Sequence, residues 1–112
     1  MPALDLIQGT LDLLVLQTLL HGPRHGYAVA RAIRQGSGEA LVVEDRALYV
    51  ALHRLEARGW VRSEWGLSDN NRRAKFYQLT PPGRQALRQK AGDWRAYARA
   101  VFRMLDSAER PA

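Results

Sequence analysis

The sequence contains no cysteine among its 112 residues, which excludes disulfide bonds, thiolate metal sites and cysteine nucleophiles. It also lacks an uncharged apolar run of membrane-spanning length. Asp5 and Asp12 interrupt the apolar stretch near the start, and no basic segment precedes that stretch, as a signal peptide would require. We therefore expect a cytoplasmic protein with no membrane contact.

Motifs for catalysis and metal binding are equally scarce. There is no glycine-rich phosphate loop and no nucleophile signature. His21 and His25 are four residues apart, but Gly22 and Pro23 interrupt any helix between them and no third metal ligand is evident. The sequence predicts a protein that is not an enzyme and that needs neither a metal nor another cofactor.

Positive charge is what the sequence has in excess. Seventeen lysines and arginines face eleven acidic residues, giving a formal net charge of +6 and a pI near 10.5. Such a balance favours a polyanionic partner. The hydrophobic content of 46% is ordinary for a folded chain, and the length suits one domain.

The first helix is predicted from apolar residues that recur every three or four positions between residues 4 and 18. Leucines and valines fill its other faces as well, so this helix is apolar nearly all round. In so small a protein, the core covers one side and something else must cover the other. Gly22 and Pro23 end the helix.

Two further helices follow. His25 to Arg34 has helical spacing and is broken by Gly36 and Gly38. A short β-prone run at residues 41–43 precedes a third helix from Arg46 to Arg58, which Gly59 closes.

Alternating residues then predict a hairpin with strands at Trp60–Trp65 and Lys75–Leu79. We expect a connecting loop of six or more residues that includes Gly66, with Asn70 and Asn71 tolerating positive φ angles.

Thr80 is a candidate N-cap for the last helix. That helix is expected from Gly83 to about Leu105, with a frayed tail after Asp106.

Three compact helices, a hairpin and a long helix make up the winged helix-turn-helix arrangement, in which the hairpin is the wing. The predicted fold is mainly α. We divide the chain into a winged helix-turn-helix DNA-binding domain (1–80), a C-terminal dimerisation helix (81–106) and a tail (107–112).

The third helix and the wing carry the candidate DNA-binding residues. Arginine can bond guanine edges or phosphate, and tyrosine commonly bonds phosphate. A solvated helix face, or a charged strand edge that prevents aggregation, would explain the same residues without DNA. The helix candidates are Arg46, Tyr49, His53 and Arg54, and the wing candidates are Arg72, Arg73 and Lys75.

The last helix carries a heptad seam, which is typical of helix–helix association. Packing onto the domain's own core is the alternative. Because the first helix also needs cover, we expect a two-fold dimer that joins the two helices. Trp94 could also stack against a flat apolar effector. The predicted dimer interface consists of Leu4, Ile7, Leu11, Leu87, Ala91, Trp94, Ala98, Val101 and Leu105.

Three blocks together resemble the PadR-like transcriptional regulators: LIQGTLDLLVLQTLLHGPRHGYAVARAI (6–33), LYVALHRLEARGWV (48–61) and NNRRAKFYQLTPPGR (70–84). The resemblance extends to about Leu105 and implies a bacterial repressor with a winged-helix domain and a dimerisation helix. The single short C-terminal helix is similar to the compact branch of the family. The resemblance places Tyr27 near the DNA backbone and Trp94 near where some relatives sandwich planar aromatic compounds.

One stretch departs from the family pattern. Relatives usually have Gly-Ser-Leu-Tyr-Pro-Ala-Leu where this chain has RALYVAL, residues 46–52. Val50 in place of proline restores a backbone N–H and adds apolar surface. Arg46 adds a contact to phosphate or base, so we expect a different operator sequence.

The leading hypothesis is a homodimeric repressor that binds double-stranded DNA at an inverted repeat. One alternative is a winged-helix module that binds another protein, because a fold does not settle a function. Another is a sensor whose DNA affinity depends on a small aromatic effector at the dimer interface.

Overall fold

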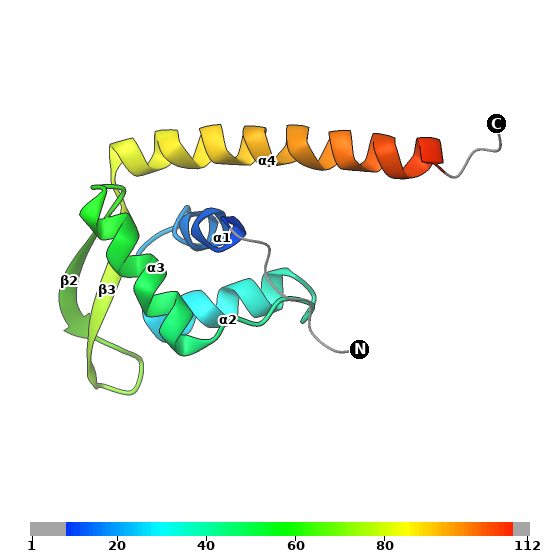
Figure 1. The fold of residues 1–112 in the computed structure, drawn as a ribbon. Helices are drawn as coiled ribbons and strands as arrows, with labels where there is room; N and C mark the ends of the chain where they lie inside the picture. Colours follow the sequence, from blue (N-terminus) through cyan, green and yellow to red (C-terminus); the bar gives the residue numbers. More distant parts are fainter. Residues whose placement is uncertain (1–8, 109–112) are drawn as a thin grey trace.

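A computed structural model describes residues 9–108 of the chain. The expected order of three helices, a hairpin and a long helix is confirmed, with one short strand added (Figure 1). The elements are α1 (Thr10–Thr18), β1 (Arg24–His25), α2 (Gly26–Gly36), α3 (Asp45–Ala57), β2 (Val61–Leu67), β3 (Arg73–Leu79) and α4 (Pro81–Ala108).

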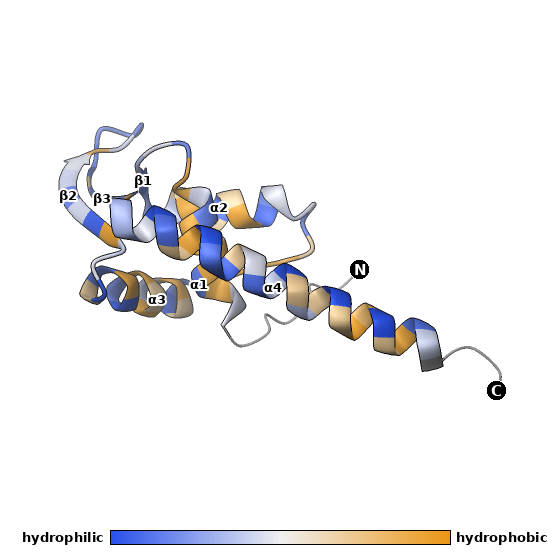
Figure 2. Cartoon of the chain, turned by 90° about the horizontal axis from the view of Figure 1, so that it is seen from above, coloured by the Kyte–Doolittle hydropathy of each residue, from blue (hydrophilic) through white to orange (hydrophobic). Residues whose placement is uncertain are grey.

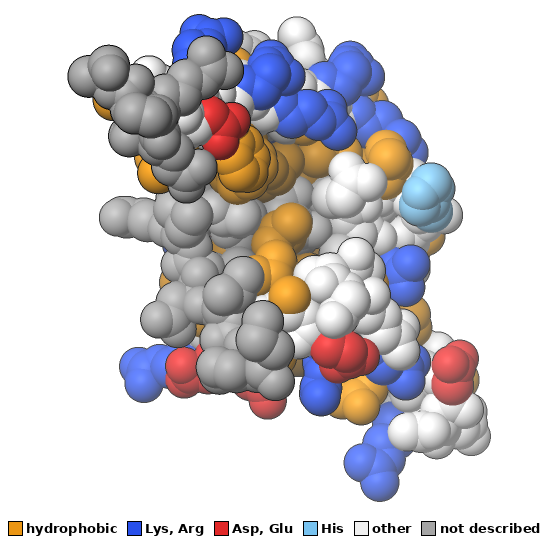
Figure 3. Space-filling view, turned by 90° about the vertical axis from the view of Figure 1, so that its right-hand side faces the viewer, with side chains coloured by type: hydrophobic (Ala, Val, Ile, Leu, Met, Phe, Trp, Pro, Cys, Tyr) orange, Lys and Arg blue, Asp and Glu red, His pale blue; other side chains and the backbone are white. Residues whose placement is uncertain are grey.

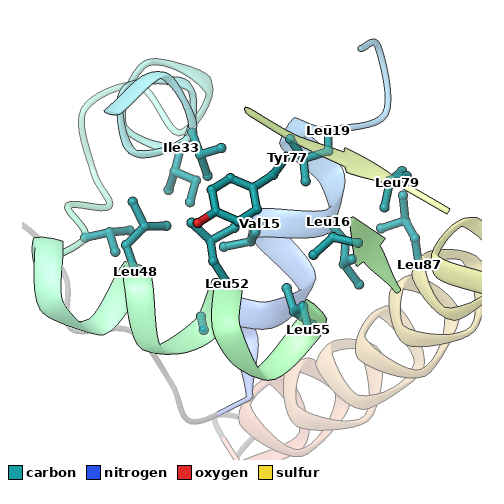
Figure 4. Close-up of a cluster of buried hydrophobic side chains, with 14 residues drawn as sticks. Val15, Leu16, Leu19, Ile33, Leu48, Leu52, Leu55, Tyr77, Leu79 and Leu87 are labelled. Atoms are coloured by element: carbon teal, nitrogen blue, oxygen red, sulfur yellow. The ribbon is translucent and has the colours of Figure 1, made fainter. Parts of the chain in front are cut away.

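The core lies around α1, where α2, α3, the sheet and the start of α4 meet. Val15 and Leu16 of α1 have no exposed surface, and neither does Leu52 of α3. Tyr77 and Leu87 bring β3 and α4 into the same cluster (Figure 4). Leu11, Leu13 and Leu14, on the other sides of α1, are only half-buried, as a helix that is apolar nearly all round requires in a small domain.

The helix boundaries have local causes. The His25 side chain caps α2 by accepting a hydrogen bond from the Ala28 N–H at 3.2 Å. Gly59 follows α3 with φ 77°, as predicted for its C′ glycine. The predicted cap of α4 is confirmed, because Thr80 Oγ1 accepts a hydrogen bond from the Gly83 N–H at 3.1 Å. The predicted starts of α3 and α4 fall one and two residues late.

The sheet has three strands in the order β1–β3–β2, all antiparallel. The hairpin was predicted too short: β2 runs on to Leu67 with Gly66 inside it, so the loop is only residues 68–72. Asn71 has the expected positive φ of 60°, and Asn70 does not. Residues 41–43 form no strand beyond an isolated bridge at Leu41.

β1 was not predicted. It pairs Arg24 with Tyr77 and His25 with Phe76, so it joins the start of α2 to the wing. The position of the wing over α2 is therefore fixed by backbone hydrogen bonds.

The last helix is the longest element and runs well beyond the domain body, in a molecule 62 Å long (Figure 2). Gly83 lies against the carbonyl of Trp60, and Leu87 is buried in the core. The helix continues through Ser107 to Ala108, where a frayed tail was predicted. Within residues 9–108, no helix combines the length and apolarity of a membrane span.

Candidate nucleic-acid interface

The third helix exposes one face while leucines bury the other. Leu48 and Leu55 anchor the buried face. Arg46, Val50 and His53 are exposed and separated by steps of four and three residues, so they share the middle of the outer face. The side chains of this face, from Arg46 to His53, are exposed, and the major groove of B-DNA is wide enough to admit an α-helix.

Arg54 lies at one edge of that face and has an intramolecular partner. Its Nε and Nη2 donate hydrogen bonds to the two carboxylate oxygens of Asp12 on α1, at 3.1 and 2.5 Å. The hydrogen bond to Asp12 raises the pKa of the Arg54 guanidinium. This ion pair engages the charge of Arg54 and ties α1 to α3, and the predicted DNA contact of Arg54 stays a prediction. The Arg54 side chain keeps 42% of its surface exposed.

Tyr49 lies at the opposite edge, against the start of α2. A Cβ atom at Gly26 would lie 2.7 Å from the Tyr49 hydroxyl oxygen, so the ring needs a glycine there. The ring is 46% exposed. Tyr49 therefore belongs to the junction between α3 and α2, and Arg46 and His53 belong to the centre of the outer face.

An open cleft of about 620 Å³ lies between this junction and the wing. His25, Gly26 and Tyr27 of α2 and its cap line one wall together with Tyr49. The wing lines the other wall. Its lining residues are Trp65, Ser68, Asp69, Asn70, Arg72, Arg73, Ala74, Lys75 and Tyr77.

The register of the hairpin explains which wing residues face this cleft. Trp65 is paired with Lys75, and Leu67 with Arg73, so all four lie on the same face of the ribbon. Tyr77 continues this face into the core, where burial raises the pKa of its phenol. We call this face, which lines the cleft, the inner face of the wing. Two of the three predicted wing contacts, Arg73 and Lys75, lie side by side on it, and Arg72 is in the loop.

Sequence reasoning missed Trp65 as a candidate site residue. The Cζ atom of Arg73 lies 4.6 Å from the centre of the Trp65 ring, which is a cation–π contact, and the ring is 58% exposed. The pairing register could have revealed it, because Trp65 and Arg73 are diagonal neighbours across the strands.

Tyr27 lies at the mouth of the cleft, with 67% of its surface exposed, and its contact with the DNA backbone stays a prediction. Arg31, one turn later, places its Cζ atom 5.4 Å from the Tyr27 ring centre. Arg31 was not predicted as a site residue, although its i+4 spacing from Tyr27 was visible in the sequence.

Charge is distributed unevenly between α3 and the wing. On α3, Arg46 and Arg54 are balanced by Asp45 and Glu56. The wing from Val61 to Thr80 carries four cations against two acids, Glu64 and Asp69. Of these two elements, the wing therefore supplies the net attraction to a polyanion.

The predicted dimer seam divides into two parts. Leu87 is buried and Ala91 is half-buried against the chain's own domain. Beyond them, Trp94, Val101 and Leu105 expose 38, 40 and 56% of their surface, and Ala98 is half-buried. Leu4 and Ile7 lie outside the described residues. The apolar half of the seam is therefore available to a partner, and the effector role of Trp94 stays a prediction.

The sequence profile of the transcriptional regulator PadR-like family matches residues 15–89, which include α2, α3 and the whole wing. The chain belongs to the PadR-like family of transcriptional regulators. The resemblance and the winged helix-turn-helix fold expected from the sequence are thereby confirmed.

Solved structures of transcriptional regulators share most of this fold. A transcriptional regulator from Clostridium thermocellum is 29% identical, with a TM-score of 0.80 over 92% of this chain and 97% of that one. Bacillus subtilis PadR, solved in complex with operator DNA, is 22% identical, with a TM-score of 0.65 over 73% of this chain and 46% of that one. The latter likeness concerns the fold alone.

A longer relative contains a similar stretch. An uncharacterised 37.1 kDa protein of transposon Tn4556 from Streptomyces fradiae is 43% identical over 97 residues. These residues cover 87% of this PadR-like chain and 26% of the Streptomyces protein, so the similarity spans about a quarter of that relative.

Proposed function

We propose that this PadR-like protein is a sequence-specific double-stranded DNA-binding regulator that acts as a homodimer on an inverted repeat and represses transcription by occluding a promoter. The observation that carries the proposal is the common surface formed by the exposed face of α3 and the basic inner face of the wing. A helix that presents polar side chains beside a cationic ribbon suits a groove and its flanking phosphates.

The positions of the side chains suggest a division of roles. Arg46 and His53, central on α3, are placed to meet base edges. Tyr49 and Tyr27, at the cleft, are placed to donate hydrogen bonds to phosphate. Arg72, Arg73 and Lys75 add charge from the wing, where a narrow ribbon can follow the minor groove or backbone. Arg54 chiefly holds α1 against α3 through its ion pair with Asp12, and it contacts DNA at the edge of the surface.

The dimer follows from the exposed apolar half of α4. Trp94, Val101 and Leu105 would be covered by α1 and α4 of a second copy. A two-fold axis then presents two α3 helices to two half-sites. The solved complex of Bacillus subtilis PadR with operator DNA supports a DNA-binding role for this fold.

Selection of bound sequences from random duplex DNA, followed by gel-shift titration across a salt series, tests the proposal. We expect an inverted repeat and an affinity that falls by about a thousandfold between low and moderate salt. Arg73→Ala should weaken all sequences alike, and His53→Ala should change the preference among them.

A lack of enriched sequence together with a flat salt response would reject the proposal. That result would favour the alternative of a module that binds another protein through the wing or α4. Identical effects of the Arg73 and His53 substitutions would reject only the division of roles.

A further inference from the structure

The net positive charge of the chain is concentrated on α4 and not on the proposed DNA-binding surface, which is formed by α3 and the wing. This helix carries five arginines and one lysine against two aspartates, so it contributes four of the six net positive charges. Neither the dimer seam nor the wing accounts for this concentration.

The arginines of α4 form a row along one face. They are separated by steps of four, seven, four and four residues, which places them on the same side of a helix. All are exposed. We call this set the arginine row: Arg84, Arg88, Arg95, Arg99 and Arg103.

The row is distinct from the apolar seam. Trp94, Val101 and Leu105 repeat with their own heptad spacing, about a quarter turn or more away around the helix. Figure 3, viewed towards the end of α4, shows lysine and arginine side chains gathered along the upper edge of the molecule, over that helix. In Figure 1, α2 and the tip of the wing lie at the opposite end of the molecule.

The row has no neutralising partner in the part of the chain that the structure describes. No carboxylate of residues 9–108 lies within 4 Å of any of its guanidinium groups, and the ion pairs of this region involve Arg34 and Arg54. Three pairs within the row are four residues apart, a spacing at which like charges destabilise a helix. A helix with this pattern gains stability when an external polyanion binds it.

We propose that the arginine row binds a second DNA duplex, so that the dimer can hold two DNA segments on opposite faces. The row is about 28 Å long, which matches about eight base pairs of phosphate backbone. Guanidinium groups bind phosphate in a bidentate manner, and duplex DNA presents phosphates in a long unbroken line. An acidic protein surface would have to match the same length with scattered carboxylates.

A bead-capture experiment on the full chain tests this proposal. The selected operator duplex is fixed to beads, protein is added, and retention of a fluorescent duplex of unrelated sequence is measured. The neutral variant combines Arg95→Gln, Arg99→Gln and Arg103→Gln. Its matched control changes the same three residues to lysine and keeps their charge.

We expect the wild type and the lysine control to retain the second duplex, and the neutral variant to retain at least about tenfold less, because three phosphate contacts are lost. Operator affinity should remain within about threefold for all three proteins, because the proposed DNA-binding surface is untouched. Glutamine is a good helix former, and circular dichroism and sedimentation check that fold and dimer persist.

Three results would overturn the proposal. The first is equal retention of the second duplex by the wild type and the neutral variant. The second is retention of polyglutamate but not of DNA, which would assign the row to an acidic protein. The third is a neutral variant that becomes monomeric, which would assign the arginines to the dimer contact.

A further variant distinguishes failure of the proposed operator binding from failure of the arginine row. A combined Arg72→Gln and Arg73→Gln variant should lose the bead-bound operator but keep salt-sensitive binding of free duplex through the row. If the wild type does not hold the operator at all, the function proposed above fails. The salt dependence of free-duplex binding by wild type and neutral variant then still tests the row.

Discussion

Trp65 shows how a single side chain of the wing can act through a neighbour. Its ring supports the guanidinium of Arg73, so the arginine is held over the inner face of the wing. We predict that Trp65→Ala weakens DNA binding by about two- to fivefold, the effect of losing an exposed cation–π contact. The salt slope should not change because no charge is removed, whereas Arg73→Ala should lower it by about one.

The double variant separates support from direct contact. If Trp65 acts through Arg73, Trp65→Ala should add nothing once Arg73 is alanine, and Trp65→Phe should restore most of the binding. Additive losses measured by gel shift would mean that Trp65 contacts DNA by itself.

Tyr77 predicts how stability changes with pH. Burial raises the pKa of its phenol in the folded protein above the unfolded value of about 10. The neutral form is therefore favoured by folding, and its stabilising contribution is full below about pH 10 and lost as the pH rises through the folded pKa. We expect Tyr77→Phe to reduce the fall in unfolding free energy between about pH 8 and pH 11.

The matched control is Tyr97→Phe, since that ring is 61% exposed on α4. Urea denaturation at both pH values should show the wild-type fall in this control. An equal fall in the Tyr77 variant would mean that other groups account for the pH dependence.

For single residues, helical periodicity could predict which side chains lie on an exposed face, but not which distant residues they contact. Helical spacing identified the outer face of α3, including Arg46 and His53. Spacing alone could not show that Tyr49 packs against α2 whereas Arg54 pairs with α1. Their partners, Gly26 and Asp12, lie 23 and 42 residues away along the chain. Contacts between distant segments depend on the packed fold.

Among the elements, α4 depends on a close contact at its first turn. A Cβ atom at Gly83 would lie 1.9 Å from the carbonyl oxygen of Trp60, which also accepts a hydrogen bond from the Thr80 N–H at 3.1 Å. We predict that Gly83→Ala lowers the free energy of unfolding by about 2 kcal/mol or more, because backbone must move. Thermal denaturation measures the loss.

Gly92 provides the control within the same helix. No atom lies within 4 Å of the position that its Cβ would occupy. Gly92→Ala should therefore stabilise the protein by about 0.5–1 kcal/mol through helix propensity. Similar effects of the two substitutions would show that the contact with Trp60 is unimportant.

Most elements followed from local signals in the sequence, and β1 did not. Gly59, Thr80 and the alternation of the wing strands predicted that α3, α4 and the hairpin exist, although both helix starts were placed late and the hairpin too short. Arg24 and His25 form a strand only because β3 offers them an edge. A two-residue strand has no periodicity of its own, so only the folded sheet reveals it.

At the scale of the whole molecule, the exposed half of the seam predicts the assembly. We expect sedimentation to show a dimer, and Val101→Glu to raise its dissociation constant by more than about a hundredfold, because an unpaired carboxylate would be buried. Ala96→Glu adds the same charge on the other side of α4 and should leave the dimer intact. A wild-type monomer would contradict the proposed assembly.

The close contact between Gly83 and the Trp60 carbonyl fixes one end of α4 beside the wing. A small rotation about this contact therefore moves the far end of the helix. The helix is about 42 Å long, so a tilt of about 5° at this contact moves its far end by nearly 4 Å. In the proposed dimer a second subunit would hold the far portion of α4, so such a tilt would change the distance between the two α3 helices. On the proposed inverted repeat, the accepted spacing of the two half-sites would then depend on the absence of a side chain at Gly83, at the opposite end of α4.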